Sequence, residues 1–247
     1  MMRSSLKIAL LTWLLISPAS LITQEHDPSP EADRVLNHLR ERFDRIEDYQ
    51  VNLEVSLDMP MLRMPRKRMT FSFKQPDKTR LEARGFAMVP RRGLALSPDS
   101  LLHTLHDLEV VTGDTLIDGH PSILLQGFEE GPDNLRLLAE VIVDREIWVV
   151  RAITTRQEEK EIFRIQIDYL EVAPGLYMPE ETRLAFQLNE RFLRGRYQGR
   201  GASFDPDIPA PIVEEGQDMT GEASIRFSNY RVNHGIADSY FEDDGDQ

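Results

Sequence analysis

The sequence predicts an α+β protein that is mainly antiparallel β: a curled, incomplete β-barrel covered by an N-terminal helix and a second short helix. Apolar residues recur at spacings of three and four near the N-terminus, and then at every second position through most of the chain. Short turn signals separate the alternating runs. Neighbouring strands must therefore pair antiparallel, because parallel neighbours would need crossover helices. The chain has no cysteine, so a buried core rather than disulfide bonds must stabilise it.

Residues 1–19 are predicted to be a secretory signal peptide. Arg3 and Lys7 precede the apolar run Ile8–Ile16, and Ala19 follows it closely. The run is shorter than the roughly 20 apolar residues that span a bilayer, so we expect cleavage near Ala19, with an uncleaved membrane anchor as the alternative. Residues 20–29 then form a linker. Since a bacterial lipoprotein needs a cysteine after its signal, the exported product is expected to be soluble and not lipidated.

The charge of the exported chain argues against nucleic acid as a partner. Loss of Arg3 and Lys7 lowers the 29 basic residues to 27, against 42 acidic residues, so the net charge moves from −13 to −15. Nucleic acid is held mainly by Lys and Arg that neutralise phosphates, and an excess of carboxylates repels it. Basic clusters at 63–68, 91–92 and 191–200 could face phosphate or lipid head groups, but solvated turns explain them more simply.

Two amphipathic helices are predicted to cover the sheet. Ser29 is a suitable N-cap and Pro30 a suitable first residue for a helix over about 30–48. Its apolar stripe consists of Val35, Leu36, Leu39, Phe43, Ile46 and Tyr49. The second helix begins at Ser97–Ser100. It is expected to continue through leucines at helical spacing, namely Leu101, Leu102, Leu105 and Leu108.

Most of the remaining chain is predicted to form strands. Alternation begins at Met69–Lys74, turns at Gln75–Asp77 and resumes at Leu81 and Ala83. Further strands are expected at 109–118, 121–128, 138–144, 147–156, 161–171, 181–193 and 221–230. Residues 199–220 are expected to form an irregular excursion, and residues 242–247 a disordered acidic tail.

Many of the predicted strands have one apolar face. Phe163, Ile165 and Ile167 oppose polar residues on one strand, as Leu184 and Phe186 do on another. A sheet of eight or more such strands curls, and its apolar face can enclose one small ligand.

Reaction centres are weakly represented. His103 and His106 have a spacing that could share a metal on a helix, but no third ligand matches them, so two surface histidines are expected. The aspartates at 205, 207, 243, 244 and 246 lack the spacing of a calcium loop. There is no thiol, no Gly-x-Ser-x-Gly motif and no phosphate-binding loop. We therefore expect a protein that is not an enzyme, with no catalytic residue, no metal and no cofactor, while an unassigned hydrolase is the third alternative.

Three stretches of the chain, taken in order, carry a family resemblance. The first is Val35–Tyr49 running into Gln50–Ser56, and the second is Val141–Ala152 with the two runs that follow it at 163–169 and 175–180. The third is Phe227–Phe241, which ends in Asn-x-x-Ile-x-Asp-x-x-Phe. Together they resemble the LolA-like outer-membrane lipoprotein-sorting proteins, the lipoprotein carrier superfamily. The resemblance implies a half-barrel domain over residues 30–241, a periplasmic location and a role in outer-membrane biogenesis.

The expected ligand site is the apolar face of the sheet beneath the helices, which would act as a lid. A sixteen-carbon chain leaving a membrane loses on the order of 12 kcal/mol, at about 0.8 kcal/mol per methylene, unless a dry cavity receives it. The residues predicted to line this cavity are Leu39, Phe43, Ile46, Phe71, Phe73, Leu81, Leu101, Leu102, Leu105, Phe163, Ile165, Ile167, Leu184, Phe186, Leu188 and Phe227.

The function predicted from these features is a carrier that binds acyl chains or lipoproteins. A membrane-associated protein is a further expected partner, nucleic acid is not, and the carrier is expected to be a monomer. Two alternatives remain open. The same side chains could fill one another's space and form a solid core, and the same fold could serve as a lipid-sensing or protein-interaction module without transport activity.

Overall fold

The computed structural model describes residues 28–59, 62–83, 97–131, 134–188 and 219–242. The predicted signal peptide, most of the linker, all but the last two residues of the excursion at 199–220, and the acidic tail beyond Glu242 lie outside these residues, so these features stay predictions. Within the described residues, no helix is long and apolar enough to cross a membrane.

The described chain forms ten strands, two α-helices and a short 3₁₀ helix. The helices are α1 (Pro30–Phe43), α2 (Pro98–Leu102) and η2 (Asp238–Phe241). The strands are β1 (Asp48–Met59), β2 (Leu62–Lys74), β3 (Lys78–Ala83), β4 (Leu105–Ile117), β5 (His120–Glu130), β6 (Arg136–Asp144), β7 (Val149–Gln157), β8 (Lys160–Ala173), β9 (Leu176–Leu188) and β10 (Met219–Val232).

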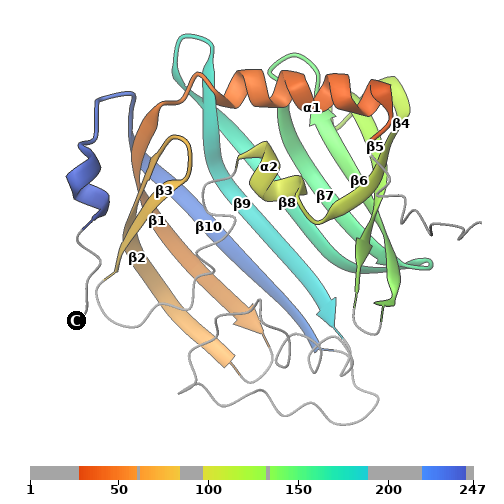
Figure 1. Cartoon of the computed structure of the whole chain (residues 1–247). Helices are drawn as coiled ribbons and strands as arrows, with labels where there is room; N and C mark the ends of the chain where they lie inside the picture. Colours follow the sequence, from red (N-terminus) through yellow and green to blue (C-terminus); the bar gives the residue numbers. More distant parts are fainter. Residues whose placement is uncertain (1–27, 60–61, 84–96, 132–133, 189–218, 243–247) are drawn as a thin grey trace, which may run out of the picture.

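All ten strands belong to one antiparallel sheet that curls without closing. The strand order is β3-β2-β1-β10-β9-β8-β7-β6-β5-β4, so β3 and β4 are edges. Figure 1 shows α1 crossing the upper end of the curled sheet and α2 lying below it, inside the curl. The predicted class, the open curled sheet and the two covering helices are thus confirmed.

The predicted turns explain much of the order along the sheet. Asp118 and Gly119 join β4 to β5 with positive φ angles of 50° and 84°, which is the backbone of a tight hairpin turn. Gly175, at φ 66°, joins β8 to β9. Because each turn is short, consecutive strands from β4 to β9 are also neighbours in the sheet.

The helices are shorter than predicted. Ser29 caps α1 as expected, accepting the N–H of Ala32 at 3.2 Å, but the helix ends at Phe43 rather than near residue 48. The second helix was predicted to run through Leu105 and Leu108, and this is wrong. It ends at Leu102, and both leucines lie in β4, because their spacing fits a bulged strand as well as a helix. His103 and His106 are consequently not partners on one helix.

The last strand lies between the first strand and β9, and a buried carboxylate fixes this arrangement. Asp48, at the start of β1, is only 2% exposed. Its carboxylate accepts the backbone N–H groups of His234, Gly235 and Ile236 at 3.1, 2.9 and 3.1 Å. Asn233 completes the junction, since its side chain accepts the N–H of residue 47 and donates to the carbonyl of residue 45, both at 2.8 Å.

The residues that follow β10 also contact β2 and β3 at the edge of the sheet. Lys74 of β2 donates to the carbonyl of Ile236 at 2.6 Å, and Lys74 and Lys78 pair with Asp238 at 2.5 and 3.0 Å. Hydrogen bonds from the two lysines lower the pKa of the Asp238 carboxyl. The ending quoted for the family resemblance is therefore a structural anchor.

Replacing Asp48 by Asn should destabilise the fold by roughly 3 kcal/mol, because three buried N–H groups lose a charged acceptor. The measurement is the free energy of unfolding from chemical denaturation. Glu47→Gln is the matched control, since its side chain is exposed, and it should cost less than about 0.5 kcal/mol. Equal stability of the two variants would contradict the anchoring role of Asp48.

Candidate functional site

A small apolar hollow lies beneath the helices where two core clusters meet. The first cluster packs α1 and α2 against β4–β7, and the second joins Ile46 to β1, β2, β9 and β10. The hollow has a cavity volume of about 40 Å³, while one water molecule needs roughly 10–15 Å³. Its walls are Leu39, Arg42, Phe43, Ile46, Tyr49, Pro98, Leu101, Trp148, Val149, Val150, Tyr169, Tyr177, Met178, Pro179, Phe227 and Tyr230.

Trp148 reaches the hollow from a turn that a buried ion pair holds. Asp144, at the end of β6, is 1% exposed and accepts two N–H groups of the following turn at 2.9 and 3.1 Å. Arg151 donates to the same carboxylate at 2.8 and 3.0 Å. The turn gives Trp148 a φ of 50°, which bulky residues rarely adopt. The centroid of its ring lies 4.3 Å from the ring centroid of His38 on α1, so the network places an indole against the helix.

Tyrosines form much of the sheet wall of the hollow: Tyr49 is buried, and Tyr169 and Tyr230 are half-buried. The Tyr169 hydroxyl donates to the carbonyl of Val150 at 2.9 Å, and the Tyr230 hydroxyl donates to the carbonyl of Pro179 at 2.8 Å. Burial raises the pKa of Tyr49, Tyr169 and Tyr230 well above the ordinary value. The wall is therefore aromatic and uncharged over the ordinary pH range.

Arg42 is the one charged residue among those that line the hollow. Its guanidinium lies 5.4 Å from the centre of the Tyr177 ring. Its Nε is buried and has no hydrogen-bond partner among the described residues. Burial, and then the charge of Arg45, lower the pKa of Arg42.

A half-buried apolar floor continues the same face of the sheet below the hollow. Phe163 pairs with Phe186, and Ile165 pairs with Leu184, across β8 and β9. All four side chains are partly exposed. Ile167, two residues further along the same face of β8, is fully buried. Figure 1 shows the lower ends of β8, β9 and β10 extending beyond both helices.

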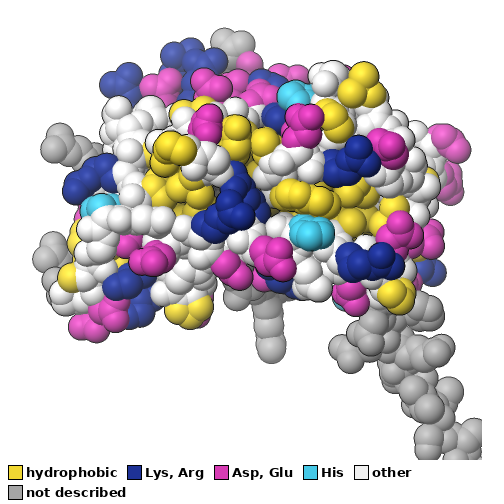
Figure 2. Space-filling model, turned by 90° about the horizontal axis from the view of Figure 1, so that it is seen from above, with side chains coloured by type: hydrophobic (Ala, Val, Ile, Leu, Met, Phe, Trp, Pro, Cys, Tyr) yellow, Lys and Arg dark blue, Asp and Glu magenta, His cyan; other side chains and the backbone are white. Residues whose placement is uncertain are grey.

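The view from above shows how apolar and basic side chains are arranged around the end of the site. Apolar side chains gather in two groups on this face, with Lys or Arg side chains between and beside them (Figure 2). Asp and Glu side chains also surround these groups, so this end of the molecule combines apolar contact with charge of both signs (Figure 2).

The structure divides the predicted cavity residues into several groups. Those that line the hollow are Leu39, Phe43, Ile46, Leu101 and Phe227. Those buried in the packed interior are Phe71, Phe73, Leu102 and Ile167. Those on the floor are Phe163, Ile165, Leu184 and Phe186. Leu81 packs against the second cluster and Leu105 against the first, while the side chain of Leu188 lies outside the described residues. A ligand at these positions remains a prediction.

The sequence patterns do not reveal Trp148, Tyr177 or Arg42 as part of the wall. Trp148 was placed in a strand and Tyr177 near a turn, and neither showed a periodic pattern that pointed to a pocket. No sequence signal separates Arg42 from the other arginines of the helix, such as Arg40 in the same turn. No group of three His, Asp or Glu side chains in the described part of the chain could hold a metal ion.

No family model matches the sequence, and no curated protein matches it. Solved structures do match. A Vibrio parahaemolyticus domain assigned as an outer membrane lipoprotein-sorting protein aligns with a TM-score of 0.51 and 10% identity, over 85% of this chain and 97% of that one. The chain shares the fold of that domain. A DUF1329 family protein from Desulfovibrio piger aligns with a TM-score of 0.51 and 12% identity, over 85% and 97% of the two chains. At these identities the likeness establishes the fold alone, and the fold expected from the resemblance is confirmed.

The raised pKa values of the three wall tyrosines predict that the free energy of unfolding falls in alkali. Because the folded pKa values of Tyr49, Tyr169 and Tyr230 lie above the unfolded value of about 10, their stabilisation is complete below about pH 10 and declines as pH rises further. The free energy of unfolding between about pH 8 and pH 11, followed with tyrosinate absorbance, measures this. Tyr230→Phe should make the decline shallower, and titration of every tyrosine near pH 10 without loss of stability would contradict the assignment.

Proposed function

We propose that this protein is a periplasmic, non-enzymatic carrier that binds acyl chains or lipoproteins reversibly beneath α1 and α2, without a cofactor. The observation that carries the proposal is the apolar hollow and the half-buried apolar floor on one inner face of the sheet. Partly exposed phenylalanine and leucine side chains in a concave surface favour an apolar ligand, because such a patch is otherwise costly in water.

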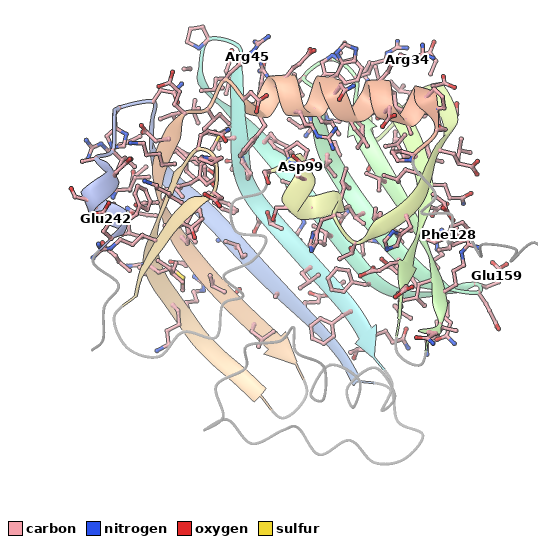
Figure 3. The ribbon with its side chains drawn as sticks, in the orientation of Figure 1. Arg34, Arg45, Asp99, Phe128, Glu159 and Glu242 are labelled. Atoms are coloured by element: carbon pink, nitrogen blue, oxygen red, sulfur yellow. The ribbon has the colours of Figure 1, made fainter. Side chains whose placement is uncertain are left out.

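The size of the hollow means that binding requires the helices to shift. A volume of about 40 Å³ is too small for an acyl chain, since it matches only a few water molecules. Opening would join the hollow to the floor. The two helices are linked by the ion pair of Arg40 and Asp99 at 2.8 Å, which is exposed and is worth about 0–1 kcal/mol. Figure 3 labels Asp99 on α2, inside the curl.

Export of the protein belongs to the same proposal. The predicted signal peptide and the likeness to a lipoprotein-sorting domain support a location in the periplasm. A half-barrel domain over residues 30–241 is part of the same proposal.

A protein-interaction module of the same fold is the second candidate. Edge strand β4 carries two exposed apolar side chains, Val111 and Leu116, which are 52% and 70% exposed. An unpaired strand edge with apolar side chains can add a strand from a partner. Substitution of both residues by Lys separates the candidates, because a carrier retains lipid binding whereas an interaction module loses its partner.

Binding of an acyl ligand should change the fluorescence of Trp148. The sequence has 2 tryptophans, and removal of the predicted signal peptide takes away Trp13, so the emission of the exported protein reports on the hollow. Titration with an acylated peptide should shift the emission, and native mass spectrometry should find the bound mass. Trp148→Phe is the control that loses the optical signal but keeps the mass. Absence of both signals would overturn the carrier proposal.

The floor can be tested with a pair of substitutions on β9. Leu184→Gln places an amide on the apolar face, and Ala185→Gln places the same group on the opposite face of the same strand. We expect Leu184→Gln to weaken acyl-peptide binding about tenfold, because roughly 1.4 kcal/mol of apolar contact is lost. Ala185→Gln should leave the affinity unchanged. Equal affinities of the two variants would mean that the floor is not part of the site.

A further inference from the structure

We propose that the site selects amphiphiles with an anionic head group, and that Arg42 binds this head group at the α1 end of the hollow. The inference rests on the proposed function and narrows its ligand class. It predicts that a fatty carboxylate or an alkyl phosphate binds better than a neutral chain of equal length.

The Arg42 side chain has an unusual hydrogen-bonding state. Its Nε is one of two buried side-chain polar atoms without a hydrogen-bond partner in the described part of the chain, the other being the hydroxyl of Thr182 on β9. Nearly all buried polar groups in folded proteins are hydrogen-bonded. A guanidinium that keeps a free donor beside an otherwise apolar and aromatic hollow is therefore suited to an acceptor that arrives with a ligand.

Nearby carboxylates do not satisfy Arg42. Glu171 is close enough to raise the pKa of Arg42, but its carboxylate accepts the N–H of Gly175 at 2.5 Å, and Arg42 forms no ion pair with it or with another described residue within 4.0 Å. Asp99 pairs with Arg40 instead. The contact with the Tyr177 ring stabilises positive charge but supplies no acceptor atom for an N–H group.

Helix stabilisation does not account for this arrangement. A basic residue in the last turn of a helix interacts favourably with the helix dipole, and Arg40 supplies that interaction from an exposed position. The dipole does not require a buried Nε. Arg45, two residues beyond the helix, adds a second positive charge near Arg42 and lies past the end of α1 in Figure 3.

The chemistry of the site then defines the ligand. Guanidinium presents its N–H groups as a fork that matches the two oxygens of a carboxylate or a phosphate. The adjoining lining, which includes Phe43, Ile46 and Leu101, suits the methylenes next to that head group. A cationic head group would be repelled by Arg42 and Arg45.

The experiment measures binding of laurate, lauryl phosphate and lauryl alcohol to the exported chain by isothermal titration calorimetry. In the native sequence, laurate and lauryl phosphate should bind more tightly than lauryl alcohol. Arg42→Gln should weaken binding of the two anions roughly 30-fold and leave lauryl alcohol unchanged. Arg45→Gln removes the same charge from a neighbouring position and should change the affinity for each ligand by less than about threefold.

Different results overturn different parts of the inference. If all three ligands bind the native protein with equal affinity, the proposed acyl-chain binding is supported, and the proposed contact of Arg42 with the head group is rejected. The same holds if Arg42→Gln weakens all three ligands to the same extent. If none binds, the proposed function fails as well. Tighter binding of lauryl phosphate than of laurate would identify phosphate as the preferred anionic head group. Binding of inorganic phosphate without binding of any lauryl ligand would show an anion site that has no site for the chain, and this would contradict the proposal. The ranking of ligands on the native protein tests the inference even if Arg42→Gln does not fold.

Discussion

The buried carboxylate of Asp48 joins the two ends of the described chain, and the continuity of the sheet depends on this junction. Strand β10 is the link between two groups of strands, β3-β2-β1 on one side and β9 to β4 on the other. Asp48 holds the residues that follow β10 through three backbone N–H groups. A buried charge is tolerated only when such partners satisfy it. The inner face is one surface because β10 pairs with both β1 and β9, and Asp48 fixes the chain that leaves β10.

The curvature of that surface explains why a hollow lies under α1. A helix of 14 residues is a rod about 21 Å long, and it cannot follow a curled sheet. The start of α1 packs against β4–β7 in the first cluster, and Ile46, just beyond its end, packs in the second cluster. Leu39 and Phe43 lie between these two regions and line the gap. The hollow is thus a consequence of a straight element that crosses a curved one.

Local patterns could predict what depends on neighbours in the sequence. Ser29 and Pro30 predict the start of α1, and alternation predicts β8 and its inward residues, because these signals act within a few positions. The place of β10 beside β1 could not be predicted, because it depends on residues about 180 positions apart. Leu105 and Leu108 were wrongly predicted to be helical because their spacing is compatible with a helix. They lie in β4, which pairs with β5.

In the candidate site, too, some residues could be predicted from local sequence patterns and others could not. Apolar residues such as Leu39 and Phe227 could be assigned to the inner face from their periodicity. Trp148 could not, because its position depends on a turn held by the Asp144–Arg151 pair and on a backbone angle that no pattern reveals. Arg42 could not be distinguished from other arginines of an amphipathic helix, because its distinguishing property is a buried donor, which only the packing shows.

The attachments of the two helices indicate which of them would move if the site opened as proposed. The start of α1 is fixed by a hydrogen bond from the N–H of Ser29 to the carbonyl of Leu108 at 2.8 Å. The chain beyond its end is fixed by Asn233, which donates to the carbonyl of Arg45. Helix α2 has only five residues, and its ion pair with α1 is exposed and weak. A short helix also has little stability of its own. Displacement of α2, which carries Pro98 and Leu101 of the lining, therefore costs less than displacement of α1, and it would leave Arg42 in place to receive a head group.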